Sequence, residues 1–316
     1  MLRRSLLLSS AVLAMTAFAT PAAIAQDDLT IASSMPSLGF PFFVHMANQL
    51  RAEAESIGGI TLIESDGQNS APKQTGDIEA AIVQGADAIV MSPLDVNALA
   101  PAVEQAVAAG VAVVTVDRRV DGVEGILAHV GADNVLGGEA QARAVMEAFP
   151  DGATIFHLQG QPGAGPAIDR NQGVHNVLDE AGEQYNIVFE QTANFSRSEA
   201  LSVVEAGLAA NGAPDVIIAA NDDMALGAME AVAAAGLTDV AIYGFDALPE
   251  ALAAVRDGGL AGTVEQFPGE QARTALRIAV DFKRDGTEPE SEVVLLTPIV
   301  IGTDNIDQAE RLGEIQ

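Results

Sequence analysis

Short, continuously apolar runs alternate with longer segments in which apolar residues recur every three or four positions, from Leu29 to Asp257. The continuous runs predict strands buried on both faces, and the periodic segments predict amphipathic helices. Strands are predicted at 29–34, 60–65, 86–93, 111–117, 125–133, 153–160, 185–191, 215–220, 240–246 and 261–266. Helices are predicted at 43–57, 74–84, 98–109, 138–149, 167–181, 197–210, 224–235 and 249–257. This alternation predicts an α/β fold with parallel sheets and right-handed crossovers.

The alternation restarts near residues 129–135, and no Pro-, Ser- or Gly-rich linker marks the restart. A chain of 316 residues is long enough for two domains. We therefore expect two similar Rossmann-like lobes that are joined by strands rather than by a flexible tether.

Residues 1–25 are predicted to be a signal peptide. Arg3 and Arg4 precede an apolar stretch from Leu6 to about Phe18, and Ala23-Ile24-Ala25 provides a small-residue cleavage pattern. The apolar stretch is short for a membrane span, which disfavours the alternative of an uncleaved anchor helix. The mature chain is expected to begin near Gln26 and to lie in the periplasm, outside the inner membrane.

The composition narrows the classes of function. The chain carries 44 acidic and 15 basic residues, and loss of the leader's two arginines moves the formal charge from −29 to −31. Such acidity disfavours nucleic acid and anionic lipid as partners. The absence of cysteine excludes disulfides and thiol catalysis. No pair among the four histidines has metal-ligand spacing on a helix turn, so neither a metal nor a cofactor is expected.

Four of the apolar runs end on polar residues that can bind a hydroxyl group. Ligands of open α/β sheets bind beyond the carboxyl ends of the strands, so these residues are expected to face one crevice. They are Asp117, Arg118, Asn221, Asp246 and Gln266. A carboxylate accepts hydrogen bonds from ligand hydroxyls, and a guanidinium donates to ligand oxygens.

Each of these positions also has an ordinary structural interpretation. Asp117 and Arg118 could form a salt bridge at a strand end. Asn221 and Asp246 could cap the helices that follow them, and Asp222 is expected to be such a cap. Arg170 lies near the start of a predicted helix, where a cation is disfavoured by the helix dipole, so a ligand or a carboxylate partner is expected beside it.

Phenylalanines are expected to provide an apolar wall for the ligand. The loop Met35–Phe43 contains Phe40, Phe42 and Phe43, and exposing three such rings to water is unfavourable by about 25 cal/mol per Å². At least one of them is expected to pack as a hydrophobic staple. The others would stack on the C–H face of a sugar ring, with Phe195 closing the opposite side.

A glycosidase that uses Asp117 and Asp246 is one alternative. Such an enzyme needs one carboxyl group that stays protonated near neutral pH. The neighbouring arginines are expected to lower the carboxyl pKa instead, which would leave no general acid. Two carboxylates and two guanidiniums carry no net charge together, and this balance favours a neutral, hydroxyl-rich ligand.

Several short motifs of this chain, taken together, match those of a known family. The matching motifs are PFF at 41–43, VTVDR at 114–118, DNVLGG at 133–138, LQG with a downstream DR within 158–170, NDDMALGA at 221–228, GFD at 244–246 and EQFP at 265–268. With these motifs the chain resembles the type I periplasmic sugar-binding proteins of the ribose-binding type over about 29–300. Members of that family deliver ligand to ABC transporters.

The resemblance implies a monomer of two lobes joined by three crossover strands, which close on the ligand. The implied N-terminal lobe is 26–131 plus 267–295, and the C-terminal lobe is 132–266 plus 296–316. The implied ligand contacts are Phe42, Phe43, Asp117, Arg118, Arg170, Phe195, Asn221, Asp246 and Gln266. The implied partners are an inner-membrane permease with a cytoplasmic ATPase, and a chemoreceptor is a further candidate.

One position departs from the family pattern. Ribose binders carry an asparagine just before the PFF motif, and this chain has Phe40 there. An apolar ring in place of an amide predicts a ligand other than ribose, such as another pentose, a hexose, a deoxysugar, a furanose form or a small polyol. A receptor for a sugar-like signalling molecule and a sugar-responsive repressor core remain alternatives. The leader and the acidity disfavour the repressor, which needs a basic headpiece.

Overall fold

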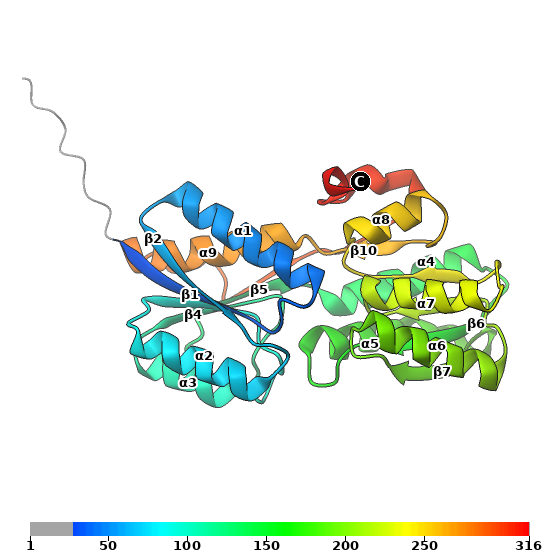
Figure 1. The fold of residues 1–316 in the computed structure, drawn as a ribbon, viewed down its shortest axis with the longest axis horizontal. Coiled ribbons are helices and arrows are strands. Elements are labelled where there is room, and N and C mark those ends of the chain that lie inside the picture. Colours follow the sequence, from blue (N-terminus) through cyan, green and yellow to red (C-terminus); the bar gives the residue numbers. More distant parts are fainter. Residues whose placement is uncertain (1–27, 316) are drawn as a thin grey trace, which may run out of the picture.

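The protein consists of two α/β lobes that lie side by side along the long axis of the molecule (Figure 1). The computed structural model describes residues 28–315, so the predicted signal peptide at 1–25 lies outside the described residues. Within 28–315, no helix has the length and hydropathy that a membrane span requires. The predicted fold class is confirmed, since both large sheets are parallel and helices cover their faces.

The N-terminal lobe is built on a six-stranded parallel sheet in the order β2-β1-β3-β4-β5-β11. Its strands are β1 (Leu29–Met35), β2 (Ile60–Asp66), β3 (Ala88–Met91), β4 (Ala112–Val116), β5 (Ala128–Ala132) and β11 (Val293–Leu296). Helices α1 (Pro41–Ile57) and α9 (Pro268–Asp285) cover one face, and α2 (Ala71–Val83) and α3 (Ala100–Ala108) cover the other (Figure 1). Burial on both faces explains why β3 is apolar throughout and why β4 is apolar except at Thr115.

The C-terminal lobe repeats this layering on a four-stranded parallel sheet in the order β7-β6-β8-β9. Its strands are β6 (Ala153–Gln159), β7 (Tyr185–Thr192), β8 (Val216–Ala219) and β9 (Ala241–Tyr243). Its helices are α4 (Asn134–Ala148), α5 (Gly165–Ala181), α6 (Arg197–Asn211), α7 (Asp222–Ala234) and α8 (Pro249–Arg256). Helices α4 and α5 pack together, as do α6 and α7. Short 3-10 segments lie at Gly182–Gln184, Thr303–Gln308 and Leu312–Glu314.

The chain passes between the lobes at three places. It leaves β5 for α4, it leaves β10 (Thr263–Glu265) for α9, and it leaves β11 for β12 (Ile299–Ile301). Strands β10 and β12 pair with each other in antiparallel register, so two of the three passages run side by side. Phe267, between β10 and α9, has a left-handed backbone with φ 58°, which marks a sharp change of direction there.

Several helices begin earlier than the hydrophobic pattern predicts. Helix α4 begins at 134 rather than 138, and α2 begins at 71 rather than 74. Ser70 and Asp133 cap these helices by accepting hydrogen bonds from the amides of Lys73 and Leu136. A polar cap determines where each of these helices begins, and apolar periodicity does not report that position. Helix α9 and strands β11 and β12 were not among the predicted elements.

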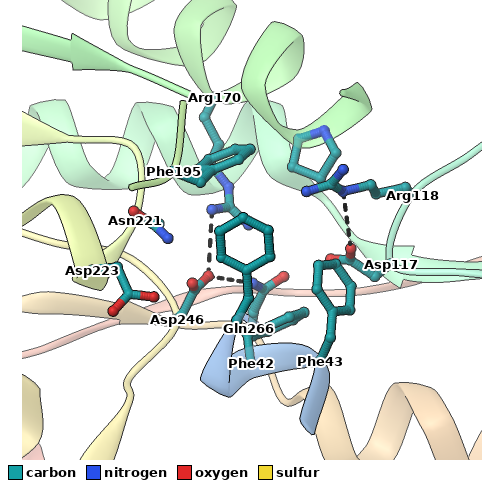
Figure 2. A pocket seen from close by; sticks show the side chains of 12 residues that line it. Phe42, Phe43, Asp117, Arg118, Arg170, Phe195, Asn221, Asp223, Asp246 and Gln266 are labelled. Atoms are coloured by element: carbon teal, nitrogen blue, oxygen red, sulfur yellow. Dashed lines mark hydrogen bonds and ion pairs between the residues drawn. The ribbon is translucent and has the colours of Figure 1, made fainter. Parts of the chain in front are cut away.

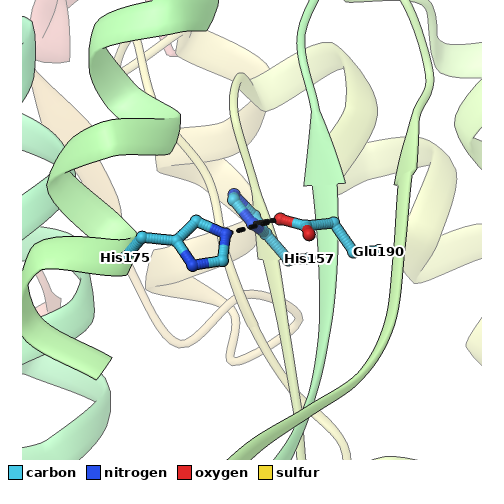
Figure 3. A group of neighbouring side chains, drawn as sticks. All are labelled: His157, His175 and Glu190. Atoms are coloured by element: carbon cyan, nitrogen blue, oxygen red, sulfur yellow. Dashed lines mark hydrogen bonds and ion pairs between the residues drawn. The ribbon is translucent and has the colours of Figure 1, made fainter. Parts of the chain in front are cut away.

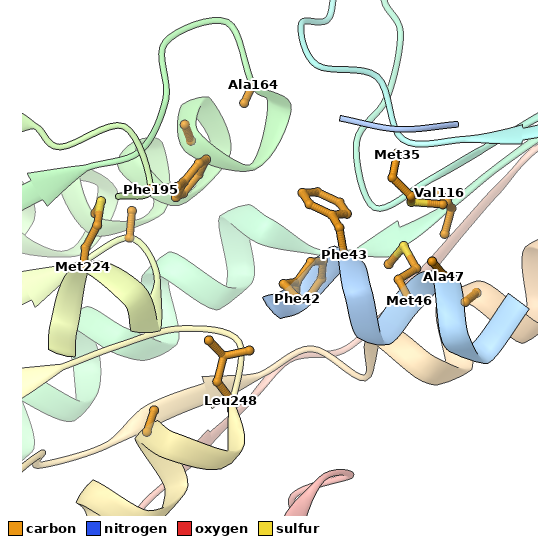
Figure 4. Close-up of a cluster of buried hydrophobic side chains, with 14 of the residues drawn as sticks. Met35, Phe42, Phe43, Met46, Ala47, Val116, Ala164, Phe195, Met224 and Leu248 are labelled. Carbon is orange, nitrogen blue, oxygen red and sulfur yellow. The ribbon is translucent and has the colours of Figure 1, made fainter. Parts of the chain in front are cut away.

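One cluster of buried apolar side chains includes residues of both lobes. Phe42, Phe43 and Met46 of α1 belong to it, together with Ala164 and Phe195 of the C-terminal lobe (Figure 4). Phe42 and Phe43 are thus buried in the first turn of α1 rather than in the loop predicted at 35–43, as the cost of exposing them suggests. Their position places them at the junction of the two lobes, where the site lies.

Candidate functional site

A pocket between the lobes is lined by every side chain that the sequence predicts for the site (Figure 2). The space that its side chains leave is small, about 360 Å³ including the part that is open to solvent. The predicted residues that line it are Phe40, Phe42, Phe43, Asp117, Arg118, Arg170, Phe195, Asn221, Asp246 and Gln266. Residues that were selected because they follow the carboxyl ends of strands therefore meet in one pocket, and they come from both lobes.

The polar wall of the N-terminal lobe follows the end of β4. Asp117 has a left-handed backbone with φ 62°, and its Oδ2 accepts a hydrogen bond of 3.3 Å from the hydroxyl of Ser92. The Nε of Arg118 lies 3.8 Å from the same oxygen, and its Nη1 donates to the carbonyl of Leu94 at 3.1 Å. The expected salt bridge is present, and its two charges also line the pocket.

The polar wall of the C-terminal lobe joins three side chains from distant segments. Nη1 of Arg170 lies 3.4 Å from Oδ1 of Asp246, and Nε2 of Gln266 donates to the same oxygen at 2.6 Å. Arg170 also donates to Asn134 and to the carbonyl of Ala220. The carboxylate partner expected beside Arg170 is therefore Asp246. Asp246 does not cap a helix, since α8 begins after Leu248 and has no side-chain cap.

Unfavourable backbone angles coincide with the pocket. Asp246 has φ 112° and Phe195 has φ 59°, in addition to Asp117 at the end of β4. Such conformations cost about 1–3 kcal/mol each in residues other than glycine, and they concentrate at functional sites. Their presence at three pocket residues indicates that surrounding contacts hold these side chains in place.

The aromatic rings contact the buried arginines. The guanidinium carbon of Arg118 lies 5.2 Å from the ring centre of Phe43 and 5.6 Å from that of Phe195. The guanidinium carbon of Arg170 lies 3.6 Å from the ring centre of Phe245. These cation–π contacts fix the orientation of both guanidiniums. Phe195 thus contacts Arg118 of the opposite lobe as well as lining the pocket.

The residues around the start of α7 have roles other than those predicted. Asn221 is the cap of α7, because its Oδ1 accepts from the amide of Met224 at 3.0 Å. Its Nδ2 can still donate into the pocket that Asn221 lines. The prediction that Asp222 caps the helix was wrong. Asp222 is fully buried and accepts hydrogen bonds from Thr263 and from the amide of Leu248, which joins α7 to the adjoining loops.

Burial changes the acid–base properties of the pocket. It raises the pKa of Asp246 to about 7, against the opposing effect of Arg170, and raises the pKa of Asp117 against that of Arg118. The arginines do lower these two pKa values, as expected, but the expected net decrease was wrong. Desolvation outweighs the charge interaction because all four groups are enclosed. Burial likewise lowers the pKa of Arg118 to about 10.

Two buried polar atoms of the pocket residues lack a hydrogen-bond partner among residues 28–315. One is Nε of Arg118, a donor, and the other is Oε1 of Gln266, an acceptor. Buried polar atoms are normally paired, so each points to a group that the protein itself does not supply. A hydroxyl group accepts and donates at once, so it can satisfy both kinds of atom.

Two lining residues were missed by the sequence analysis. Pro166 lies in the first turn of α5, four residues before Arg170 and hence on the same face of the helix. Asp223 lies in the first turn of α7, and burial raises its pKa. The spacing from Arg170 could have identified Pro166. The NDD run at the strand end could have identified Asp223.

Comparisons with known proteins agree with this geometry. A family model described as a periplasmic binding protein domain matches residues 31–287. The chain is 44% identical to the Caulobacter myo-inositol binding protein, solved with bound myo-inositol, with a TM-score of 0.88 over 92% of this chain and 98% of that one. A Bacillus halodurans ABC transporter solute binding protein with bound myo-inositol is 29% identical, with a TM-score of 0.84 over 90% and 97%. The ribose import binding protein of Bacillus subtilis is 38% identical over 81% of this chain and 82% of that protein.

Proposed function

Because this chain belongs to the periplasmic binding protein family, as a type I sugar-binding protein of the ribose-binding kind, we propose that its ligand is a neutral cyclic polyol of the myo-inositol class. The chain is the solute-binding component of an ABC sugar transporter, and it holds a sugar or sugar-like molecule between two lobes. The proposal concerns which molecule that is and which residues bind it.

The composition of the pocket wall is the observation that carries the proposal. Asp117, Asp246, Arg118 and Arg170 are buried together, and the formal charges of these four groups cancel, while Asp223, whose pKa is raised by burial, adds a third carboxyl group to the wall. A charged ligand would upset that balance in a poorly solvated site, whereas a neutral polyol keeps it. The hydroxyls of such a ligand would accept from Nε of Arg118 and donate to Oε1 of Gln266.

Two observations favour a cyclic polyol over ribose. Phe40 lines the pocket where the ribose binders carry an asparagine, so the wall is apolar at that point. The relative with 44% identity has myo-inositol bound, and the ribose import protein is 38% identical. Myo-inositol is a six-carbon ring with a hydroxyl on every carbon. Its C–H bonds can face the rings of Phe42 and Phe43 while its hydroxyls meet the polar groups.

We propose that two lobes close around the ligand when it binds. One lobe comprises residues 26–131 and 267–295, and the other comprises residues 132–266 and 296–316. Groups from each lobe line the pocket, so a ligand that touches both stabilises the closed arrangement. Direct contacts between the lobes accompany closure. Arg119 pairs with Asp169, and Gln161 donates to Asn69 at 3.0 Å.

The rest of the transport route follows from the family. A membrane permease coupled to an ATPase would receive the ligand from the closed form. Secretion into the periplasm would follow cleavage of the leader after residue 25. Aryl glycosides of glucose and galactose are expected to remain intact with this protein, because the proposed role of Asp117 and Asp246 is to accept hydrogen bonds rather than to transfer protons.

Calorimetric titration with a panel of neutral compounds tests the proposal. The panel holds myo-inositol, ribose, allose, glucose, xylitol and arabinose. Myo-inositol is expected to bind most tightly with one site per chain, and ribose at least tenfold more weakly. If ribose or xylitol binds more tightly than myo-inositol, the assignment of the ligand class is wrong. If none of the six binds, the assignment of the pocket is wrong as well.

A further inference from the structure

Two histidines and a glutamate form a compact cluster in the C-terminal lobe, away from the pocket. His157 comes from β6, Glu190 from β7 and His175 from α5 (Figure 3). One potential ligand atom from each residue lies within 4.8 Å of the other two. His157 is 1% exposed, whereas His175 and Glu190 are each about one-third exposed. The cluster is thus open to solvent on one side only.

A β-bulge places Glu190 beside His157. Strands β6 and β7 pair Ile155 with Ile187, but the next pair is Phe156 with Phe189, so β7 contains one extra residue. Without the bulge His157 would lie opposite Phe189. Bulges reorient side chains next to functional sites, and this one brings a carboxylate to a buried imidazole.

Hydrogen bonds orient all three side chains toward one point. Oε1 of Glu190 lies 2.8 Å from Nδ1 of His157 and 2.8 Å from Nε2 of His175. The carboxylate can only accept, so both ring nitrogens donate to it. The other ring nitrogen of His175, Nδ1, lies 3.3 Å from Oδ1 of Asp179. A carboxylate in that position is the usual outer partner of a metal-bound histidine, where it fixes the ring orientation.

We propose that His157, His175 and Glu190 bind one Zn²⁺ ion, with the fourth position open to water. Two imidazoles and one carboxylate form a three-ligand set typical of zinc, whereas magnesium and calcium require mainly oxygen ligands. Ligand atoms at about 2.0–2.1 Å from a tetrahedral ion lie roughly 3.3 Å apart. The 2.8 Å contacts must therefore open by about 0.5 Å, which the partly exposed His175 and Glu190 allow.

Zinc would replace the two protons that His157 and His175 now share with Glu190. The ion would link α5 to the two strands beneath it and so stabilise the C-terminal lobe. The sequence analysis looked for two histidines at metal-ligand spacing on one helix turn and therefore predicted no metal. It did not find this cluster because the three proposed ligands come from three separate elements.

The test is a zinc titration of the full purified chain after removal of metals with a chelator. One Zn²⁺ per chain is expected, and saturation with zinc is expected to raise the melting temperature by about 5 °C. His175→Ala and Glu190→Gln are each expected to weaken zinc binding at least tenfold. Asp179→Asn is expected to weaken it about tenfold. Zinc affinity should fall as pH drops from 8 to 6, because protons compete for the imidazoles.

The matched control is His45→Gln. His45 lies 3.4 Å from Glu314, so it forms a histidine–carboxylate pair in another part of the chain, but no second histidine joins it. This variant is expected to bind zinc as the parent does, and all variants should melt cooperatively in chelator. Absence of a stoichiometric site would overturn the proposal. So would equal zinc binding by His175→Ala, by Glu190→Gln and by the parent, which would indicate only adsorption to the acidic surface.

Discussion

Arg170 and Asp246 lie 3.4 Å apart at the pocket although 76 positions separate them in the chain. Arg170 lies on α5, which follows β6, whereas Asp246 follows β9 of the same sheet, and Gln266 donates to the same carboxylate oxygen at 2.6 Å. Contacts within the protein thus orient the charged groups before a ligand arrives. Such preorganisation reduces the cost of ordering side chains on binding.

Replacing Asp246 with asparagine is expected to weaken polyol binding at least tenfold. The substitution preserves size, but it removes the charge that pairs with Arg170 and the acceptor that meets ligand hydroxyls. A hydrogen bond to a charged group contributes about 1.5–3 kcal/mol, and 1.4 kcal/mol corresponds to a tenfold change. Calorimetry measures the change, and Asp239→Asn on the surface is the control. Equal affinity of Asp246→Asn and the parent would remove Asp246 from the site.

Asp169→Asn is expected to weaken binding about two- to fivefold without altering any residue that lines the pocket. Asp169 pairs with Arg119 of the opposite lobe, and a partly exposed pair of this kind contributes about 0.2–1 kcal/mol to closure. Asp121→Asn is the matched control, because Asp121 also pairs with Arg119 but lies in the same lobe. If both variants bind ligand equally well, the pair between the lobes does not support closure.

Phe40→Asn is expected to shift selectivity toward ribose. The amide adds a hydrogen-bonding group at a position that is apolar here, so the ratio of myo-inositol to ribose affinity should fall severalfold. Phe40 is the N-cap residue of α1, and its side chain forms no capping hydrogen bond. Because asparagine is favoured at N-cap positions, folding should tolerate this substitution. Phe40→Leu keeps the wall apolar and is expected to leave the ratio near that of the parent. An unchanged ratio in Phe40→Asn would mean that this position does not select the ligand.

The free energy of unfolding is expected to fall as pH rises from 5 to 8. Burial raises the pKa of Asp246 and that of Glu265 to about 7, from ordinary values of 3.8 and 4.5. The folded state therefore retains protons that the unfolded chain has already lost. The contribution of these protons to the free energy of unfolding is fully present below the ordinary pKa values, and it is lost as the pH rises through the raised pKa values near 7.

Denaturant titrations at several pH values, at high salt to screen surface repulsion, measure this dependence. Glu265→Gln removes one of the buried carboxyl groups whose pKa is raised and should make the decrease shallower. Glu265 does not line the pocket, so its effect on stability is separate from ligand binding. A free energy that is constant or increases over this pH range would contradict the burial of these carboxyl groups.

The sequence predicts which side chains line the pocket because strand ends are local features. Asp117, Asn221 and Asp246 each follow a short apolar run, and parallel strands bring such ends to one edge of a sheet. The sequence analysis left out Asp223 and Pro166, although the NDD run and the spacing from Arg170 point to them, because their exposure to the pocket depends on where α7 and α5 begin. Caps determine those positions, and apolar periodicity does not report them.

Other features depend on tertiary structure alone. The sign of the pKa shift at Asp117 follows from the depth of burial, which exceeds the effect of the adjacent Arg118. The cluster of His157, His175 and Glu190 depends on a bulge in β7 and on the packing of α5. Neither a bulge nor helix packing leaves a pattern that the sequence alone makes visible.

A crystal structure of the chain with myo-inositol tests the central claim most directly. The ring is expected between the lobes, with its C–H groups against Phe42 and Phe43. Its hydroxyls are expected within hydrogen-bond distance of Asp117, Arg118 and Gln266. Myo-inositol bound at another surface, or bound to groups of one lobe only, would contradict the account.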